Sequence, residues 1–309
     1  MPFNRLRRLG LTGIDVSPVT LGTSFLGNPA QPDGTPAPEA YGLAREMLAS
    51  RFAAVDTSNN YAQGRSETVL GGVLREGVLQ DGHLVITKAD ADPVTGHFDR
   101  DRVWRSFEES AERLGLEKLP LFHLHDPFAL SFEEAFAPGG AVQGMTELKD
   151  QGLVGAIGIA AGEITPMRQF VGSGVFDAVL THNRYTIVDR RAEDLLQDAT
   201  ERGMGVFNAA PFGGGLLAGK GTSYAYRESP AALLEWLDKA KALCAEWSLE
   251  LPAVALQFSL NSPLIHSTVV GVNRPERLED LQRLQSISVP PEFWTELEKL
   301  GTPPSTIAD

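Results

Sequence analysis

The sequence contains very little cysteine, because Cys244 is the only one among 309 residues. A lone cysteine excludes an intrachain disulfide, which fits a reducing compartment, and we expect a cytoplasmic protein. Long apolar stretches are also missing, since no run of about 18 uninterrupted apolar residues is present to cross a bilayer. The basic start at residues 1–10 is not followed by the apolar run of a secretory signal. The sequence therefore predicts neither a transmembrane helix nor a signal peptide.

Positive charge is scarce relative to negative charge. The chain has 27 lysines and arginines against 40 aspartates and glutamates, a formal net charge of −13, and no block of consecutive basic residues. Binding to nucleic acid or to an anionic membrane surface is therefore not expected. Hydrophobic residues make up 42% of the chain and charged residues 22%, proportions that allow a sizeable buried core. We expect a globular protein whose partners are small molecules.

Short apolar runs rich in β-branched residues recur along the chain and alternate with segments of helical spacing. The predicted strands are residues 19–21, 53–55, 84–87, 121–124, 155–159, 178–180, 205–207 and 267–270. Helical spacing is clearest at 103–114 and 233–243. Eight alternating strands predict a single (β/α)8 barrel over residues 1–309, because the glycine loop that a doubly wound sheet needs after an early strand is absent. The turn residues at 8–13 predict a small hairpin that plugs the barrel.

Two loops are long enough to form part of a substrate site. Residues 126–140 and 220–230 have no assigned element, and both follow predicted strands. In a barrel such loops lie over the catalytic mouth, so we expect them to contact substrate. The triple glycine at 213–215 follows the seventh strand, where barrels often bind phosphate.

Ionisable residues stand at the ends of three successive predicted strands. Asp56, Lys88 and His125 follow the second, third and fourth strands, and Tyr61 lies five residues after Asp56. Neighbouring strands are only about 4.8 Å apart, so these side chains should converge. We expect Asp56 to hold Lys88 charged, Lys88 to lower the pKa of Tyr61, and His125 to donate to a carbonyl oxygen. The group suits proton transfer at a carbonyl.

Four motifs in this order resemble the aldo-keto reductase family along nearly the whole chain. Residues 8–13 and 17–23 resemble its plug hairpin and first strand, and residues 55–61 with 64–67 resemble its second-strand motif. Ile86-Thr87-Lys88 and Leu124-His125-Asp126-Pro127 supply the matching lysine and histidine. The resemblance implies a barrel enzyme in which Asp56, Tyr61, Lys88 and His125 are catalytic.

The resemblance also implies a nicotinamide cofactor, NADP or NAD, bound across the barrel mouth. Residues 210–220 resemble the family's pyrophosphate loop, and residues 270–280 resemble the loop and helix that hold the adenosine end, where a helix start favours anions. The positions assigned in this way to the cofactor are Gly22, Thr23, Asp56, His182, Pro211, Phe212, Gly214, Leu216, Lys220, Gly271, Asn273 and Arg277.

Several positions depart from the family pattern. Where many members carry Ser-Asn, a glutamine and a ring-stacking aromatic residue, this chain has Ala160-Ala161, His182 and Ala209. Gly271 takes the place of the lysine that binds a 2′-phosphate in some branches, which leaves Arg274 or Arg277 for that task. The resemblance therefore leaves the choice between NADP and NAD open.

The substrate branch is indicated by the sequence around the fourth strand. His125-Asp126-Pro127, with residues 105–110 and 113–116 before it, is similar to bacterial aldose dehydrogenases that oxidise C1 of sugars such as fucose or galactose. Phe25 and Phe128 are expected to form an apolar wall of the substrate site beside Tyr61 and His125. An aldose 1-dehydrogenase is the first expectation, and an aldehyde or ketone reductase is the second.

Three other functions compete with hydride transfer. His123 and His125 form an H-x-H pair of the kind that binds a metal in barrel hydrolases, although the eighth strand ends without an aspartate. Lys88 could form a Schiff base as in aldolases, but a neighbouring Asp56 would keep it protonated and poorly nucleophilic. A non-catalytic regulator that only binds the nicotinamide is the third alternative.

Overall fold

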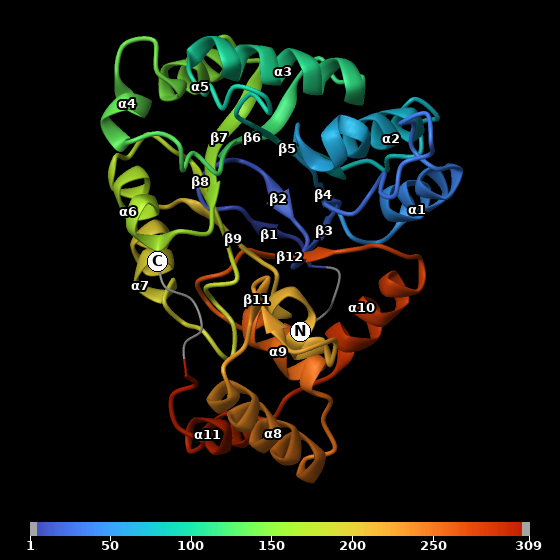
Figure 1. The fold of residues 1–309 in the computed structure, drawn as a ribbon, viewed down its shortest axis with the longest axis vertical. Coiled ribbons are helices and arrows are strands. Elements are labelled where there is room, and N and C mark those ends of the chain that lie inside the picture. Colours follow the sequence, from blue (N-terminus) through green and yellow to red (C-terminus); the bar gives the residue numbers. More distant parts are fainter. Residues whose placement is uncertain (1–4, 305–309) are drawn as a thin grey trace.

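A closed barrel of eight parallel strands forms the centre of the computed structural model, which describes residues 5–304 (Figure 1). The barrel strands are β3 (Val19–Gly22), β4 (Ala54–Asp56), β5 (Leu84–Ala89), β6 (Leu119–His125), β7 (Val154–Ala161), β8 (Ala178–His182), β9 (Gly205–Ala209) and β12 (Ser267–Gly271). Each strand pairs with the next along the chain, and β12 pairs with both β9 and β3 to close the ring. The predicted (β/α)8 barrel is confirmed.

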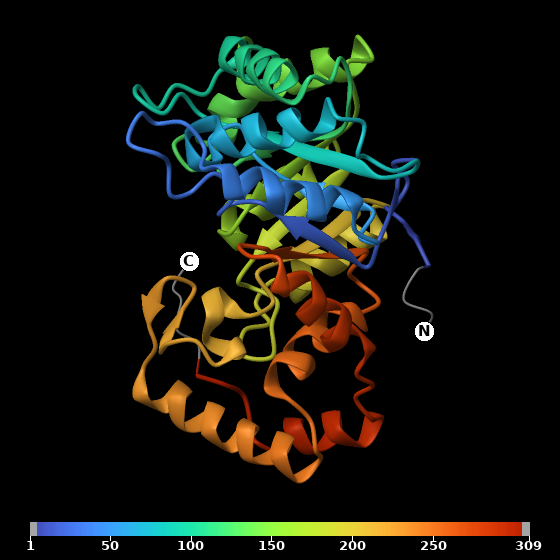
Figure 2. The same ribbon diagram turned by 90° about the vertical axis from the view of Figure 1, so that its right-hand side faces the viewer.

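Helices surround the barrel, and α3 with α5 lies at the opposite end of the molecule from α8 and α11 in both ribbon views (Figures 1 and 2). The α-helices are α1 (Pro38–Ala49), α2 (Arg65–Leu74), α3 (Arg100–Leu114), α4 (Phe132–Phe136), α5 (Ala141–Asp150), α6 (Ile164–Gly172), α7 (Glu193–Glu201), α8 (Ala231–Glu246), α9 (Leu251–Leu260), α10 (Glu276–Ser286) and α11 (Pro291–Glu298). Two 3₁₀ turns, η1 (Tyr61–Gly64) and η2 (Gly213–Ala218), follow β4 and β9. Among residues 5–304, no helix is both long enough and apolar enough to span a bilayer.

Helix α3 illustrates how the sequence fixes these boundaries. The Asp99 side chain accepts a hydrogen bond from the Arg102 backbone N–H at the start of the helix, and Gly115 ends it with a φ of 71°. Val103 and Phe107 are buried on one face, four residues apart. The helix therefore has a fixed start, a fixed end and one side packed on the barrel.

A two-stranded hairpin closes the amino-terminal end of the barrel. Strand β1 (Arg7–Arg8) pairs antiparallel with β2 (Asp15–Val16), and Leu9 packs fully buried in the same apolar cluster as the barrel-lining Phe207. Gly10 has a φ of +51°, and a Cβ there would lie 2.4 Å from the Gly203 carbonyl oxygen, so this close approach requires glycine. The predicted plug is confirmed.

The two unassigned loops contain short elements. Helix α4 lies within residues 126–140 and begins with a capping box between Ser131 and Glu134. A hairpin of β10 (Ser223–Tyr224) and β11 (Arg227–Glu228) lies within residues 220–230. Strand β6 also begins two residues earlier than predicted, because Pro120 lies at the start of the strand, where a missing N–H is tolerated.

Candidate active site

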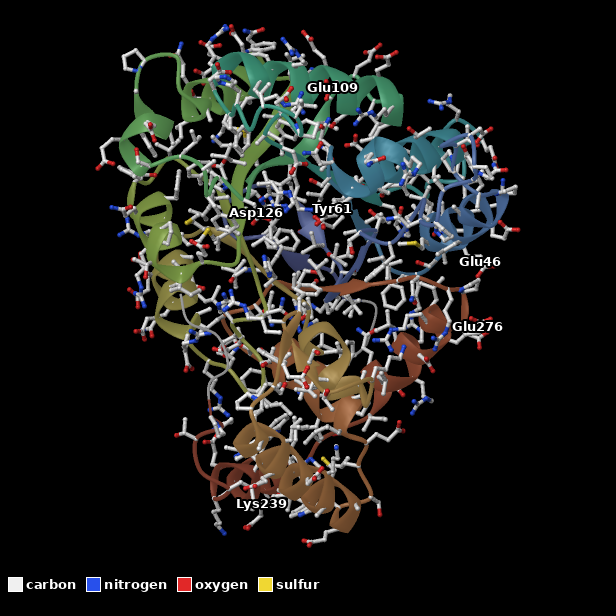
Figure 3. All side chains as sticks on the ribbon, viewed as in Figure 1. Glu46, Tyr61, Glu109, Asp126, Lys239 and Glu276 are labelled. Atoms are coloured by element: carbon white, nitrogen blue, oxygen red, sulfur yellow. The ribbon has the colours of Figure 1, made fainter. Side chains whose placement is uncertain are left out.

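The carboxyl ends of the barrel strands surround a cavity of about 460 Å³. Of the residues predicted from the sequence, those that line it are Gly22, Thr23, Phe25, Asp56, Tyr61, His125, His182, Pro211, Phe212, Gly214, Lys220, Gly271, Asn273 and Arg277. Figure 3 shows Tyr61 and Asp126 near the centre of the molecule, whereas Glu46, Glu109, Lys239 and Glu276 lie toward its edge. Residues far apart in the sequence therefore meet at the barrel mouth.

Lys88 lies beneath the cavity floor and is fully buried. Its ammonium group donates to Asp56 Oδ2 at 2.7 Å, to the Thr57 carbonyl at 2.6 Å and to the Tyr61 hydroxyl at 3.3 Å. Burial alone lowers the pKa of Lys88, but the charge of Asp56 and the contact with Tyr61 outweigh it, so the pKa is raised. Lys88 is therefore charged, and its three protons are all engaged.

The hydroxyl of Tyr61 is an acceptor in its bond with Lys88, so its own hydrogen is free to face the cavity that Tyr61 lines. Burial raises the pKa of Tyr61 to about 12, and the nearby charge of Lys88 offsets only part of that rise. Lys88 does lower the pKa of Tyr61, as expected, but burial raises it more. The expectation that the pKa would lie below its ordinary value is therefore wrong. The sequence revealed the cation but not the depth of burial.

The His125 ring is hydrogen-bonded to the carboxylate of Asp90, a residue that was not predicted from the sequence. Its Nδ1–H donates to Asp90 Oδ1 at 2.7 Å, and Asp90 Oδ2 accepts from the Ser58 hydroxyl at 2.5 Å. Burial lowers the pKa of His125, but the charge of Asp90 and their hydrogen bond raise it above its ordinary value. The sequence does contain a signal for Asp90, because it follows Lys88 by two residues, and side chains two apart at a strand end point to the same side.

Two further polar groups face the cavity from neighbouring strand ends. Asp126 Oδ2 lies 3.6 Å from His125 Nε2, and its Oδ1 has no hydrogen-bond partner within residues 5–304. His182 Nδ1 accepts from the Asn183 amide at 3.2 Å. Burial lowers the pKa of His182, so the ring is neutral and its Nε2–H is a donor. The mouth thus offers one acceptor and one donor beside Tyr61.

Left-handed backbone marks the turns at the mouth. The residues directly after β6, β8 and β9 are Asp126, Asn183 and Ala210, with φ values of 43°, 58° and 58°. Non-glycine residues rarely adopt positive φ, and such strain often concentrates at functional sites. At each of these turns the chain changes direction directly after the last residue of the strand.

The loops after β9 and β12 form the cationic part of the cavity. Lys220 and Arg277 both line it, and the Arg277 guanidinium stacks over the Phe212 ring at 4.6 Å from its centroid. Gly214 and Gly215 have φ values of 75° and 120°, a loop conformation that other residues rarely adopt. Arg274 lies 3.5 Å from Asp280 and 3.6 Å from Glu276, so its charge is already compensated.

These groups fit a dinucleotide. Lys220 and Arg277 are cations of the kind that bind phosphate, and Asp56 Oδ1 is a buried acceptor without a partner among the described residues. Such an acceptor suits a ribose hydroxyl, because a buried carboxylate oxygen left unpaired is unfavourable. The chemistry of the cavity therefore matches both the phosphates and the sugar of a nicotinamide cofactor.

Not every predicted residue reaches the cavity. Leu216 is buried in the hydrophobic core and Phe128 is 46% exposed, and neither lines the cavity. The resemblance placed these residues along the chain but could not give the direction of their side chains. Additional residues line the cavity that were not predicted as binding residues: Ser24, Asp126, Ala160, Leu180, Ala209, Ala210, Gly215, Ala218, Tyr226, Val269 and Val270.

The H-x-H pair does not form a metal site with other ligands. Within residues 5–304, no group of three or more histidine, cysteine, aspartate or glutamate side chains is arranged to hold a metal ion. His123 is fully buried and packs edge-on against Phe207, with 5.9 Å between ring centroids. Burial lowers its pKa well below the ordinary value, so His123 is neutral.

Comparisons with known proteins give the family of this chain. The model of the aldo/keto reductase family matches residues 18–302. The chain is 31% identical to D-threo-aldose 1-dehydrogenase of a Pseudomonas species, over 78% of this chain and 82% of that protein. It is 29% identical to L-galactose dehydrogenase of Arabidopsis thaliana (96% and 94% covered) and 28% identical to pyridoxal 4-dehydrogenase of Microbacterium luteolum (96% and 97% covered).

The fold is also similar to that of a solved aldo-keto reductase from Bacillus halodurans in its holo form. The TM-score is 0.75 at 20% sequence identity, with 98% of each chain covered. Neither the family match nor these relatives support the hydrolase, aldolase or non-catalytic alternatives. With its barrel, its mouth and its match over residues 18–302, this chain belongs to the aldo/keto reductase family and is an NAD(P)-dependent oxidoreductase.

Proposed function

We propose that this oxidoreductase oxidises C1 of an aldose, or of a related aldehyde that closes to a cyclic hemiacetal, and that Tyr61 exchanges the proton with the substrate oxygen. The observation that carries the proposal is the arrangement around Lys88. Because Lys88 donates to the Tyr61 oxygen, the tyrosine hydrogen faces the cavity, where a substrate oxygen can exchange a proton with it.

The other three residues support this exchange. Asp56 keeps Lys88 charged at 2.7 Å, and the charged Lys88 stabilises the phenolate form of Tyr61. His125 donates a hydrogen bond to the same substrate oxygen and fixes its position. The bound nicotinamide would supply the hydride acceptor for oxidation, or the donor for reduction of an aldehyde.

We assign the phosphates to Lys220, Arg277 and the loop of Pro211, Phe212 and Gly214, and the cofactor ribose to Asp56. The remaining predicted cofactor residues that line the cavity, Gly22, Thr23, His182, Gly271 and Asn273, complete the contact surface. Ala160 and Ala209 also line it, and their small side chains leave room for a flat ring above the strand ends.

A polyhydroxylated substrate is favoured by the polar lining of the mouth. The relatives named above are dehydrogenases of a D-threo-aldose, L-galactose and pyridoxal. Each of these compounds has an aldehyde carbon and an internal hydroxyl group that can close on it as a hemiacetal. Asp126 Oδ1 offers an unpaired acceptor and His182 offers a donor, and substrate hydroxyls would satisfy both.

For the cofactor, we propose a preference for NAD. A 2′-phosphate needs cations whose charge is not already compensated. Arg274 is paired with Glu276 and Asp280, and Arg277 is already assigned to the phosphates that NAD and NADP share. With Gly271 in place of a lysine, no additional charge is available on this loop for the extra phosphate.

A spectrophotometric panel tests the proposal. Aldoses, pyridoxal and a straight-chain aldehyde without hydroxyl groups are each assayed with NAD and NADP in both directions. We expect aldose oxidation with NAD, and no oxidation of the matched methyl glycoside, whose C1 cannot be oxidised while the glycoside is intact. Equal turnover of the glycoside would place the reaction at another carbon, and no absorbance change across the panel would refute the proposed activity.

A further inference from the structure

Asp90 is a buried carboxylate at the active site to which neither the proposed proton transfer nor the cofactor assignment gives a role. It is only 7% exposed and lies just after β5, one residue past the strand end. Its Oδ1 accepts from His125 Nδ1 at 2.7 Å, and its Oδ2 accepts from the Ser58 hydroxyl at 2.5 Å and the Asn60 backbone N–H at 2.9 Å. His125 is the last residue of β6, and Ser58 and Asn60 belong to the loop after β4, so all three donors lie at the barrel mouth.

The backbone of Asp90 is anchored independently of its side chain. The Asp90 N–H donates to the Ser106 hydroxyl at 3.1 Å, and the Asp90 carbonyl accepts from Arg102 Nε at 2.8 Å. Both partners are on α3, which packs against β5. These two bonds fix the backbone of Asp90, so the carboxylate is left to bond to His125, Ser58 and Asn60.

Charged and titratable groups face His125 from several elements of the barrel. They are Asp56, Tyr61, Lys88, Asp90, His123, Asp126 and His182. Of these, Asp90 alone is hydrogen-bonded to the His125 ring among the described residues. Lys88 opposes a positive charge on His125, and Asp126 favours it from 3.6 Å. Direct contact makes Asp90 the dominant favourable partner.

We propose that Asp90 is a positioning residue that holds His125 as an imidazolium, with Nδ1–H on Asp90 and Nε2–H facing the cavity. His125 is then a charged donor to the substrate oxygen, alongside the hydroxyl of Tyr61. Charged donors form shorter and stronger hydrogen bonds than neutral ones, and they stabilise the negative charge that develops on that oxygen. This role of His125 rests on the proposed function, but its charge state does not.

The direction of the pH effect follows from the sign of the interaction. Asp90 raises the pKa of His125, so the imidazolium is present at low pH and is lost as the pH rises through that raised pKa. Asp90→Asn preserves the shape and an acceptor for Nδ1–H but removes the negative charge. We expect the titration midpoint of His125 to fall by about 1–3 pH units, the shift typical of losing an adjacent opposite charge.

The test combines histidine-selective ¹⁵N NMR with kinetics. The chain has only 6 histidines, and a His125→Gln sample assigns the ring signals of His125. In the wild-type protein both ring nitrogens should have imidazolium shifts at neutral pH. In Asp90→Asn the midpoint should fall, and the rate constant kcat for aldehyde reduction should drop about tenfold while affinity for the dinucleotide is unchanged.

The pH profile separates positioning from a structural role. Tyr61, with a pKa of about 12, stays protonated well above neutral pH, so an alkaline loss of kcat/KM for reduction below that range reports on His125. This loss should move in Asp90→Asn by the same number of pH units as the NMR midpoint. A merely structural Asp90 would change stability without coupling the two shifts.

Asp92→Asn is the matched control, because Asp92 lies on the same loop and its carboxylate bonds only to Val94 and Thr95 among the described residues. It should leave both the midpoint and the profile unchanged. A neutral His125 ring in the wild-type protein at neutral pH would overturn the proposal even if Asp90→Asn does not fold. An equal titration midpoint of His125 in the wild-type protein and in Asp90→Asn would also overturn it. If the midpoint falls as expected but the enzyme is inactive across the substrate panel, the result would count against the proposed function only.

Discussion

Replacing Tyr61 by phenylalanine removes one oxygen atom from the active site and leaves the packing of the ring in place. The ring keeps its edge contact with His125, 5.8 Å between centroids, and its position 4.7 Å from Lys88 Nζ. The lost hydrogen bond to Lys88 is long, at 3.3 Å, and Lys88 retains two bonds of 2.7 Å and 2.6 Å. We therefore expect a stability loss of only about 0.5–1.5 kcal/mol.

The catalytic loss should be much larger than the loss of stability. A positioned general acid–base contributes about 10²–10⁴-fold to the rate, or ~3–5 kcal/mol of activation free energy. Because Tyr61 lines the part of the cavity assigned to substrate, the loss should appear in kcat and only weakly in the Kd of NAD. Initial rates in both directions, fluorescence titration of the cofactor and thermal unfolding measure these three quantities.

Tyr226→Phe is the matched control for this experiment. Tyr226 lines the same cavity, but the residue is 80% exposed, and it is not bonded to Lys88. Removing its hydroxyl should leave kcat close to the wild-type value. If Tyr61→Phe retained more than about a tenth of the wild-type rate, well above the activity expected to remain, Tyr61 would not be the proton-transfer group. His125 would then be the candidate for that role.

Two further predictions concern charge. Lys88→Met leaves Asp56 buried without its cation, so we expect the protein to lose about 3–5 kcal/mol of stability. Its kcat should also fall, but this loss should not add to that of Tyr61→Phe, and Asp56→Asn should reduce kcat less. Additive losses in the Lys88→Met, Tyr61→Phe double variant would contradict a shared role for the two residues. Glu276→Gln releases Arg274 from one of its two carboxylate partners, so the KM for NADP should fall by up to about fivefold while that for NAD stays the same. An equal change for both cofactors would show that Arg274 does not face the 2′-phosphate.

The barrel was predictable from the sequence because each strand contains a short apolar run. Buried parallel strands have both faces covered, so residues such as 155–159 have no alternation that could be confused with a helix or an exposed strand. The convergence of Asp56, Lys88 and His125 followed from the same principle, since parallel neighbours end at the same rim. Helix α4 was missed although its capping box, Ser131 to Glu134, is visible in the sequence.

Other features of the site depend on tertiary structure that the chain order does not reveal. Asp90 turns toward His125 because Ser106 and Arg102 on α3 fix its backbone, a contact across 12 and 16 residues of sequence. The raised pKa of Tyr61 reflects burial, which outweighs its neighbouring cation. Spacing along a strand gives proximity, whereas desolvation and side-chain direction depend on what packs above and below.

The two buried ion pairs explain why the site requires a rigid barrel. Asp56 with Lys88 and Asp90 with His125 join consecutive strand ends of β4, β5 and β6, with 2.7 Å between the charged atoms in both cases. Burying such pairs contributes little net stability, because the loss of hydration offsets the attraction between the charges. Their value is functional: each pair holds one donor of fixed charge beside the cavity, and the strand register sets the spacing between them. A change of charge at either aspartate should therefore alter the chemistry of the mouth while the strands keep their pairing.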